Sequence, residues 1–172
     1  GGSSPPRVVS AHLDSVFPAQ DVIPARHVEG RLVGPGIGDN ALGVAALTEL
    51  GRDLLEDPAD CPVWLAANVG EEGLGNLRGM RAVLDRFSGD ARGYIVLEGM
   101  ALGHVYHRAL PSARFEFLVE TLGGHSWTHF GRPSATHIIV EALQRLLSLP
   151  LPHEPRASFN IGSLHGGSGV NR

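Results

Sequence analysis

The 172-residue sequence has a single cysteine, Cys61, and few aromatic residues. One cysteine cannot form a disulfide within the chain, and it excludes a zinc site built from several thiolates. No apolar run approaches the roughly 20 residues that cross a bilayer, and no signal peptide is recognisable. We therefore expect a cytoplasmic protein without a membrane partner, although a removed signal peptide would leave no trace here.

The chain also lacks a large excess of charge of either sign. It has 14 Lys and Arg and 18 Asp and Glu, which gives a formal net charge of -4. This balance gives no indication of a nucleic acid or an anionic membrane as a partner. Glycine and proline are plentiful, with 23 and 12 residues, and 42% of the chain is hydrophobic. That composition favours an α/β enzyme with many tight loops over a helical bundle.

Apolar strands and amphipathic helices alternate over the first part of the chain. Short buried strands are predicted at residues 7–11, 62–69 and 94–97, and helices at residues 42–54 and 77–87. Such alternation predicts an α/β fold, with a mostly parallel sheet and helices on both of its faces.

The pattern changes near residue 110, where we place a domain boundary. Apolar and charged residues alternate over residues 114–120, which is typical of a sheet with one face in water. A helix is predicted over residues 134–149, with Ser134 as its N-cap, and a short strand over residues 159–164.

Each predicted strand, and the loop before the first helix, is followed by a histidine or a carboxylate. In open α/β sheets, sites gather at the carboxyl ends of the strands. Side chains that are far apart in sequence are therefore expected to converge: His12, Asp39, Glu71, Glu72 and Glu98.

The pattern allows more than one role for several of these side chains. His12 and Asp14 point the same way on a strand, so Asp14 either accepts the second ring N–H of a metal-bound His12 or holds the local loop. Glu71 and Glu72 are adjacent carboxylates that repel each other, and a divalent cation would offset the repulsion. The alternative is a solvated acidic turn. The alternatives are a helix N-cap for Asp39 and a water-facing charge for Glu98.

Five short segments follow one another along the chain: His12-Leu13-Asp14, Gly38-Asp39-Asn40, Gly70-Glu71-Glu72-Gly73, Leu97-Glu98-Gly99 and Gly124-His125-Ser126. In this order and spacing they resemble the dinuclear zinc metallopeptidases of family twenty. That family includes aminoacylase, glutamate carboxypeptidase, peptidase T and succinyl-diaminopimelate desuccinylase. Each segment alone is a weak signal, but the resemblance of the ordered set covers nearly the whole chain.

The resemblance implies an active site with two zinc ions, for which cobalt or manganese could substitute. His12 and Glu98 would bind one metal, and Glu72 would bind the other. Asp39 would bridge the two metals, and the Asp39–Asn40 peptide bond would be cis.

The resemblance also implies catalytic and substrate-binding roles. Glu71 would be the general base that activates the bridging water, and Asp14 would orient His12. His125 would face the oxyanion of the reaction, often across a dimer interface, and Asn171 would contact substrate.

The expected domains are both incomplete. Residues 1–110 would form a metal-binding catalytic domain, and residues 111–172 would form part of an α+β, ferredoxin-like lid that pairs two chains in a homodimer. Family members are longer, so the fifth ligand, a histidine for the second metal, is expected outside this chain. We assign no ligand role to the remaining histidines, which are His104, His107, His129, His137, His153 and His165.

The leading functional hypothesis is metal-dependent hydrolysis of the amide bond of a small peptide or an N-acyl amino acid. Aminopeptidase, carboxypeptidase and deacylase activities all stay open. One alternative is an inactive homologue or fragment that serves as a dimerisation or binding module. Another is a related aminopeptidase clan without a lid, which the alternation at residues 114–120 disfavours. A fragment, a deliberately made segment and a natural truncation would each explain the short chain.

Overall fold

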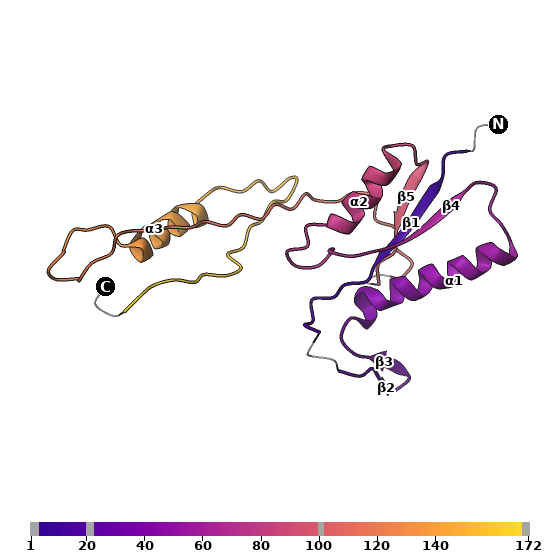
Figure 1. Cartoon of the computed structure of the whole chain (residues 1–172), viewed down its shortest axis with the longest axis horizontal. Helices are drawn as coiled ribbons and strands as arrows, with labels where there is room; N and C mark the ends of the chain where they lie inside the picture. Colours follow the sequence, from indigo (N-terminus) through magenta and orange to yellow (C-terminus); the bar gives the residue numbers. More distant parts are fainter. Residues whose placement is uncertain (1–3, 20–22, 100–101, 170–172) are drawn as a thin grey trace. The chain divides into compact units, whose positions relative to one another are not determined.

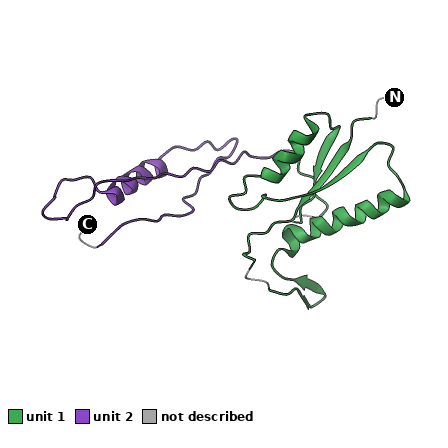
Figure 2. Cartoon of the chain, viewed as in Figure 1, with its two compact units in different colours: residues 1–107 green, residues 108–172 purple. Residues whose placement is uncertain are grey.

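The computed structural model describes residues 4–19, 23–99 and 102–169. The chain forms two compact units, residues 1–107 and 108–172, which are described separately below (Figure 2). The boundary expected from the sequence lay near residue 110. The catalytic and lid roles of the two domains stay predictions.

The first unit is built on a three-stranded parallel sheet in the order β4-β1-β5 (Figure 1). Its strands are β1 (Arg7–His12), β4 (Val63–Asn68) and β5 (Gly93–Val96). The central strand β1 is buried from Val8 to His12 because it has a neighbour on each side and a helix on each face. The predicted parallel sheet is therefore confirmed.

The two helices of this unit are α1 (Leu42–Glu56) and α2 (Arg78–Phe87), and they lie on opposite sides of the strands (Figure 1). Val9 of β1 packs in one cluster with Leu47 of α1. Ser10 points to the other face, where its Oγ lies 3.6 Å from Sδ of Met80 in α2. Successive residues of β1 thus contact different helices, as the alternation of side chains along a strand requires.

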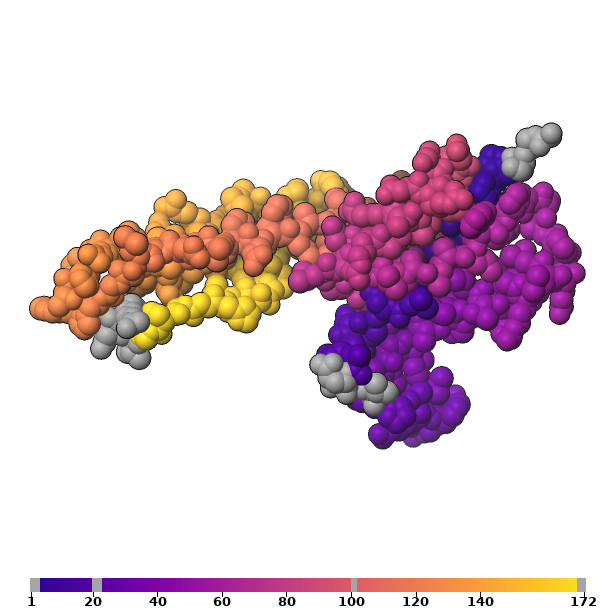
Figure 3. All heavy atoms as spheres, in the orientation of Figure 1, coloured from indigo at the N-terminus to yellow at the C-terminus, as the bar shows by residue number. Residues whose placement is uncertain are grey.

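A small hairpin, β2 (Arg26–Val28) with β3 (Arg31–Val33), was not predicted from the sequence. Its turn consists of Glu29 and Gly30, which both have positive φ, as a two-residue hairpin turn of right-handed twist requires. The hairpin is exposed and projects from the body of the first unit (Figure 3). Because it buries little apolar surface, it carries no hydrophobic alternation that would reveal it.

The second unit contains the helix α3 (Ala135–Leu147), close to its predicted bounds. Ser134 caps it as expected, because its side chain accepts a hydrogen bond from the His137 N–H at 3.4 Å. A groove between α3 and residues 116–119 is lined mainly by apolar side chains, including Phe117 and Leu143. No described helix of either unit is long and apolar enough to cross a bilayer.

The two strands expected in the second unit, at residues 114–120 and 159–164, are not formed in the described part of that unit. The ferredoxin-like sheet is therefore not seen. Alternation describes the two faces of an extended segment, but a strand also needs a hydrogen-bonded neighbour. Phe115 and Phe117, which were expected on a buried face, are exposed.

Candidate metal centre

His12 ends the central strand β1, and its side chain is 2% exposed. The ring Nδ1 lies 3.0 Å from the main-chain oxygen of Asp14, which can only accept a hydrogen bond, so Nδ1 carries the proton. In the neutral ring, Nε2 then offers a bare lone pair. This buried Nε2 has no hydrogen-bond partner among the described residues.

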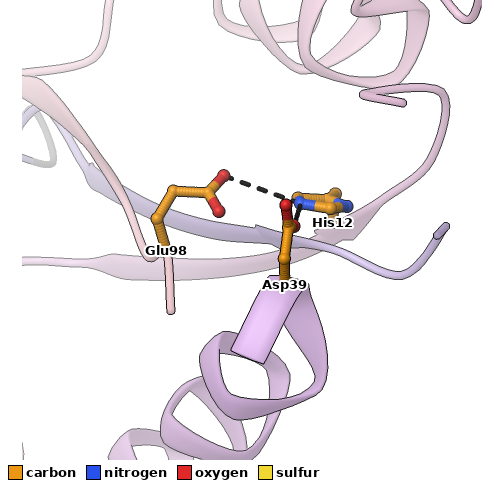
Figure 4. Close-up of side chains that lie close together, drawn as sticks. All are labelled: His12, Asp39 and Glu98. Carbon is orange, nitrogen blue, oxygen red and sulfur yellow. Dashed lines mark ion pairs between the residues drawn. The ribbon is translucent and has the colours of Figure 1, made fainter. Parts of the chain in front are cut away.

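Three carboxylates face the Nε2 atom of His12. The nearest oxygens of Asp39, Glu98 and Glu71 lie 3.0, 3.6 and 4.0 Å from it. Figure 4 shows the carboxylates of Asp39 and Glu98 turned toward the ring of His12. A lone pair surrounded by carboxylate oxygens is repelled unless a proton or a cation lies between them, so this arrangement fits a metal ion.

These side chains, together with Glu72, form two overlapping groups of candidate ligands. Ligand atoms of His12, Asp39 and Glu98 all lie within 4.8 Å of one another, and so do those of His12, Glu71 and Glu72. Imidazole and carboxylate donors without thiolates are a set that zinc accepts, and cobalt or manganese also accept it. The residues present therefore fit a cation site.

Asp39 lies in a short wide turn, η1 (Ile37–Ala41), immediately before α1. The Asp39–Asn40 peptide bond is cis, as the resemblance implied. Asn40 is buried, and its Oδ1 accepts a hydrogen bond from the Gly43 N–H at 3.1 Å. The capping role considered for Asp39 is thus taken by Asn40, which leaves the Asp39 carboxylate directed at His12.

Glu98 follows β5, and the chain beside it passes very close to η1. Asn40 Nδ2 donates to the main-chain oxygen of Leu97 at 2.8 Å. A Cβ atom on Gly99 would lie 1.6 Å from the Gly38 oxygen, so only glycine permits this approach. These two contacts hold Asp39 and Glu98 on the same side of His12.

The side chain and the backbone of Asp14 make different contacts. Its carboxylate accepts hydrogen bonds from the backbone N–H groups of Glu71 at 3.3 Å and Glu72 at 3.0 Å. His12 Nδ1 is closer to the Asp14 main-chain oxygen, at 3.0 Å, than to its carboxylate, at 3.5 Å. The side chain of Asp14 therefore holds the Glu71-Glu72 loop, and its backbone orients the imidazole.

The electrostatics of the cluster show an excess of negative charge. Burial opposes the charged form of His12, but Glu98, the Asp14 carbonyl, Glu71 and Asp39 outweigh it and raise the pKa of His12. Burial is also the main cause that raises the pKa of Glu98, against the opposite effect of His12. A bound divalent cation would neutralise this excess.

Glu72 and Asp14 shift in opposite directions. Burial raises the pKa of Glu72, and the neighbouring charges of Asp39 and Glu71 raise it further. For Asp14, burial again acts upward, but the N–H groups of Glu72 and Glu71 prevail and hold its pKa below the usual value. Asp14 is thus ionised and binds the backbone of the Glu71-Glu72 loop, whereas a cation nearby would stabilise the ionised form of Glu72.

Two predicted residues do not belong to the described part of the first unit. His125 belongs to the second unit, where it is exposed and its Nδ1 accepts a hydrogen bond from the Trp127 N–H at 3.2 Å. Asn171 lies outside the described residues. Sequence analysis assigned no role to Asn40, although an asparagine three residues ahead of a helical N–H is a capping signal that could have revealed it.

Comparison with known proteins adds one match. The model of the peptidase family M20/M25/M40 matches residues 8–163, a range that contains every candidate ligand and His125. None of the curated proteins compared matches the chain. The family match thus covers both the strand ends that form the cluster and most of the second unit.

Proposed function

The chain belongs to the peptidase family M20/M25/M40, and on this premise we propose that it takes part in hydrolysis of the amide bond of a small peptide or an N-acyl amino acid. Members of this family are metal-dependent peptidases and amidohydrolases. The observation that carries the proposal is the buried, unpartnered Nε2 of His12, with the Asp39 carboxylate at 3.0 Å and the Glu98 carboxylate at 3.6 Å.

In this proposal His12 and Glu98 would hold one metal, Glu72 would hold a second, and Asp39 would be a ligand of both. Zinc is the proposed metal because the resemblance implies it, and the imidazole and carboxylate donors accept zinc as well as cobalt or manganese. When bound, such a metal pair lowers the pKa of water and polarises the scissile carbonyl.

Glu71 is the proposed general base. Its backbone N–H donates a hydrogen bond to Asp14, while its side chain is 40% exposed and has an oxygen 4.0 Å from Nε2 of His12. Glu71 would accept a proton from the attacking water and pass it to the departing amine, as a positioned carboxylate does in general acid–base catalysis.

His125 is the proposed donor to the substrate carbonyl oxygen as negative charge develops on it. This role requires the second unit to act as a lid, and the expected homodimer would form through the same unit. Support for the lid comes only from the family match, which extends through α3. Analytical ultracentrifugation tests the dimer, and a monomer at working concentration would contradict it.

Metal content is the first test. Purified protein loaded with zinc and freed of excess should retain metal in elemental analysis, and Asp39→Ala should lose most of it. Asp53→Ala on the exposed side of α1 is the matched control and should retain as much as the parent. Equal metal content in all three proteins would refute the assignment of the cluster.

Catalysis is the second test, with di- and tripeptides and N-acyl amino acids as substrates. Glu71→Gln should keep the metal but lower turnover by about 100-fold to 10,000-fold, the usual contribution of a general base. Glu56→Gln, an exposed carboxylate on α1, is the control. Full activity of Glu71→Gln would overturn its role. Metal binding without any hydrolysis would favour the alternative of a non-catalytic binding module.

A further inference from the structure

Two histidines of the second unit bind each other across one turn of the chain. The His125 N–H donates to Nδ1 of His129 at 3.0 Å, and the His129 N–H donates to the main-chain oxygen of His125 at 3.0 Å. The Thr128 hydroxyl lies 3.5 Å from the same Nδ1 atom. His129, which sequence analysis treated as an ordinary surface or hydrogen-bonded histidine, is therefore part of the loop that presents His125.

The ring of His125, like that of His129, accepts hydrogen bonds from backbone N–H groups of the turn. Its Nδ1 lies 3.2 Å from the Trp127 nitrogen and 3.5 Å from the Thr128 nitrogen. A backbone N–H can only donate, so Nδ1 must accept, and the proton of the neutral ring must be on Nε2. The turn thus selects the tautomer in which His125 offers an N–H from the far edge of its ring.

Gly124 makes room for this arrangement. A Cβ atom at Gly124 would lie 2.9 Å from Cβ of His129 and 3.2 Å from its Nδ1. The His129 ring therefore packs directly over the backbone that leads into His125. Any side chain at position 124 would push the acceptor away from the His125 N–H.

We propose that His129 is a positioning residue: it holds the 124–129 turn so that His125 presents its Nε2–H as a neutral hydrogen-bond donor to the carbonyl oxygen of the substrate. This inference rests on the proposed function of His125. A neutral imidazole suits the task because it donates a hydrogen bond without carrying a charge that would need desolvation.

The direct test reads the tautomer by NMR, in the whole chain and without substrate. Proton–nitrogen correlation through the ring carbons distinguishes a bare ring nitrogen from a protonated one, at a pH where His125 is neutral. The parent protein should show Nδ1 of His125 bare and Nε2 protonated. His129→Leu should produce a mixture of tautomers, whereas His129→Asn should preserve the parent pattern because its Oδ1 can accept the same N–H.

Two further variants guard against a trivial loss of structure. Gly124→Ala should reproduce the effect of His129→Leu by displacing the ring, and His153→Leu, an exposed histidine of the same unit, should change nothing. In the metal-loaded protein, His129→Leu should lower kcat by up to about 100-fold with little change in KM, because the lost interaction belongs to the transition state.

A single unchanged tautomer of His125 in His129→Leu would overturn the proposal, and so would a proton on Nδ1 in the parent. Failure of the proposed function is read separately, because it would appear as absence of hydrolysis in the parent protein while the tautomer measurement still gives its answer.

Discussion

The side chain of Asn40 donates a hydrogen bond to the main-chain oxygen of Leu97 at 2.8 Å. Asn40 follows Asp39 directly, and Leu97 precedes Glu98. This single contact therefore joins two segments that are 57 residues apart and places both carboxylates beside Nε2 of His12. Stability of the fold and assembly of the cluster should thus depend on the same bond.

Asn40→Ala should lower the free energy of unfolding by about 2–3 kcal/mol, since it removes one buried and one part-buried hydrogen bond, worth about 1 kcal/mol each, and leaves partners unsatisfied. Urea denaturation monitored by circular dichroism measures this change, and zinc affinity should fall with it. Asn160→Ala, at an exposed position of the second unit, is the control. An unchanged denaturation midpoint would show that the Asn40 contacts contribute nothing.

A pair of glycine substitutions tests the close approach of η1 to the end of β5. Gly99→Ala forces a Cβ against the Gly38 oxygen and should destabilise the protein by about 1–3 kcal/mol, the usual cost of overpacking. Gly38→Ala meets no atom within 4 Å and should stay within about 0.5 kcal/mol of the parent. Thermal unfolding of both variants measures this difference in stability. Equal melting temperatures would contradict the close approach of Gly99 to the Gly38 oxygen.

Asp14→Ala removes the carboxylate that binds the N–H groups of Glu71 and Glu72 but leaves the Asp14 main-chain oxygen that orients His12. Loss of such a supporting contact typically costs about 10-fold to 100-fold in metal affinity or activity. We expect that loss in a chelator competition assay, with Asp85→Ala on the exposed side of α2 as the control. Parent-like metal affinity and activity together would show that Asp14 does not support the loop.

Metal binding should depend on pH in a direction set by the raised pKa values of His12, Glu72 and Glu98. A raised pKa means that the metal-free cluster keeps its protons to a higher pH, and a metal ion must displace them. Zinc affinity should therefore increase as pH rises through the elevated pKa of His12 and weaken progressively below it.

Chelator competition between about pH 5 and pH 8 measures this dependence, because that window contains the titration of histidine. Potentiometry should record proton release on zinc binding within the same window. His153→Leu should show the parent's dependence, since that histidine is remote in sequence from the cluster and lies in the other unit. An affinity independent of pH, with no proton release, would exclude these side chains as ligands.

The elements that could be predicted from the sequence are those whose burial leaves a clear pattern of apolar residues. The strand β1 is a short, mostly apolar run because it is buried on both faces, and the helix α1 shows a helical period because one of its faces packs against the sheet. The β2–β3 hairpin escaped prediction because it is exposed, and the strands expected at residues 114–120 and 159–164 failed because alternation alone does not supply a pairing partner.

The candidate ligands could be predicted because their position after successive strands already implies convergence at one edge of the sheet. The hydrogen bonds that hold these ligands in place could not be predicted from the sequence. Whether the side chain of Asp14 or its backbone would hold His12, and whether Asp39 or Asn40 would cap the helix, depended on contacts of a few ångströms between segments distant in sequence.

The sequence by itself determined the parallel sheet and the identity of the residues that converge, because side-chain chemistry and hydrophobic period are local properties of the chain, and the order of five short segments carried the resemblance to the family. Only the tertiary structure decided which atoms face each other: Nε2 of His12 toward Asp39 and Glu98, the Asp14 carboxylate toward the loop of Glu71 and Glu72. Hydrogen bonds and ion pairs act over about 3–4 Å, so their partners are settled only once the packed layers bring distant segments together.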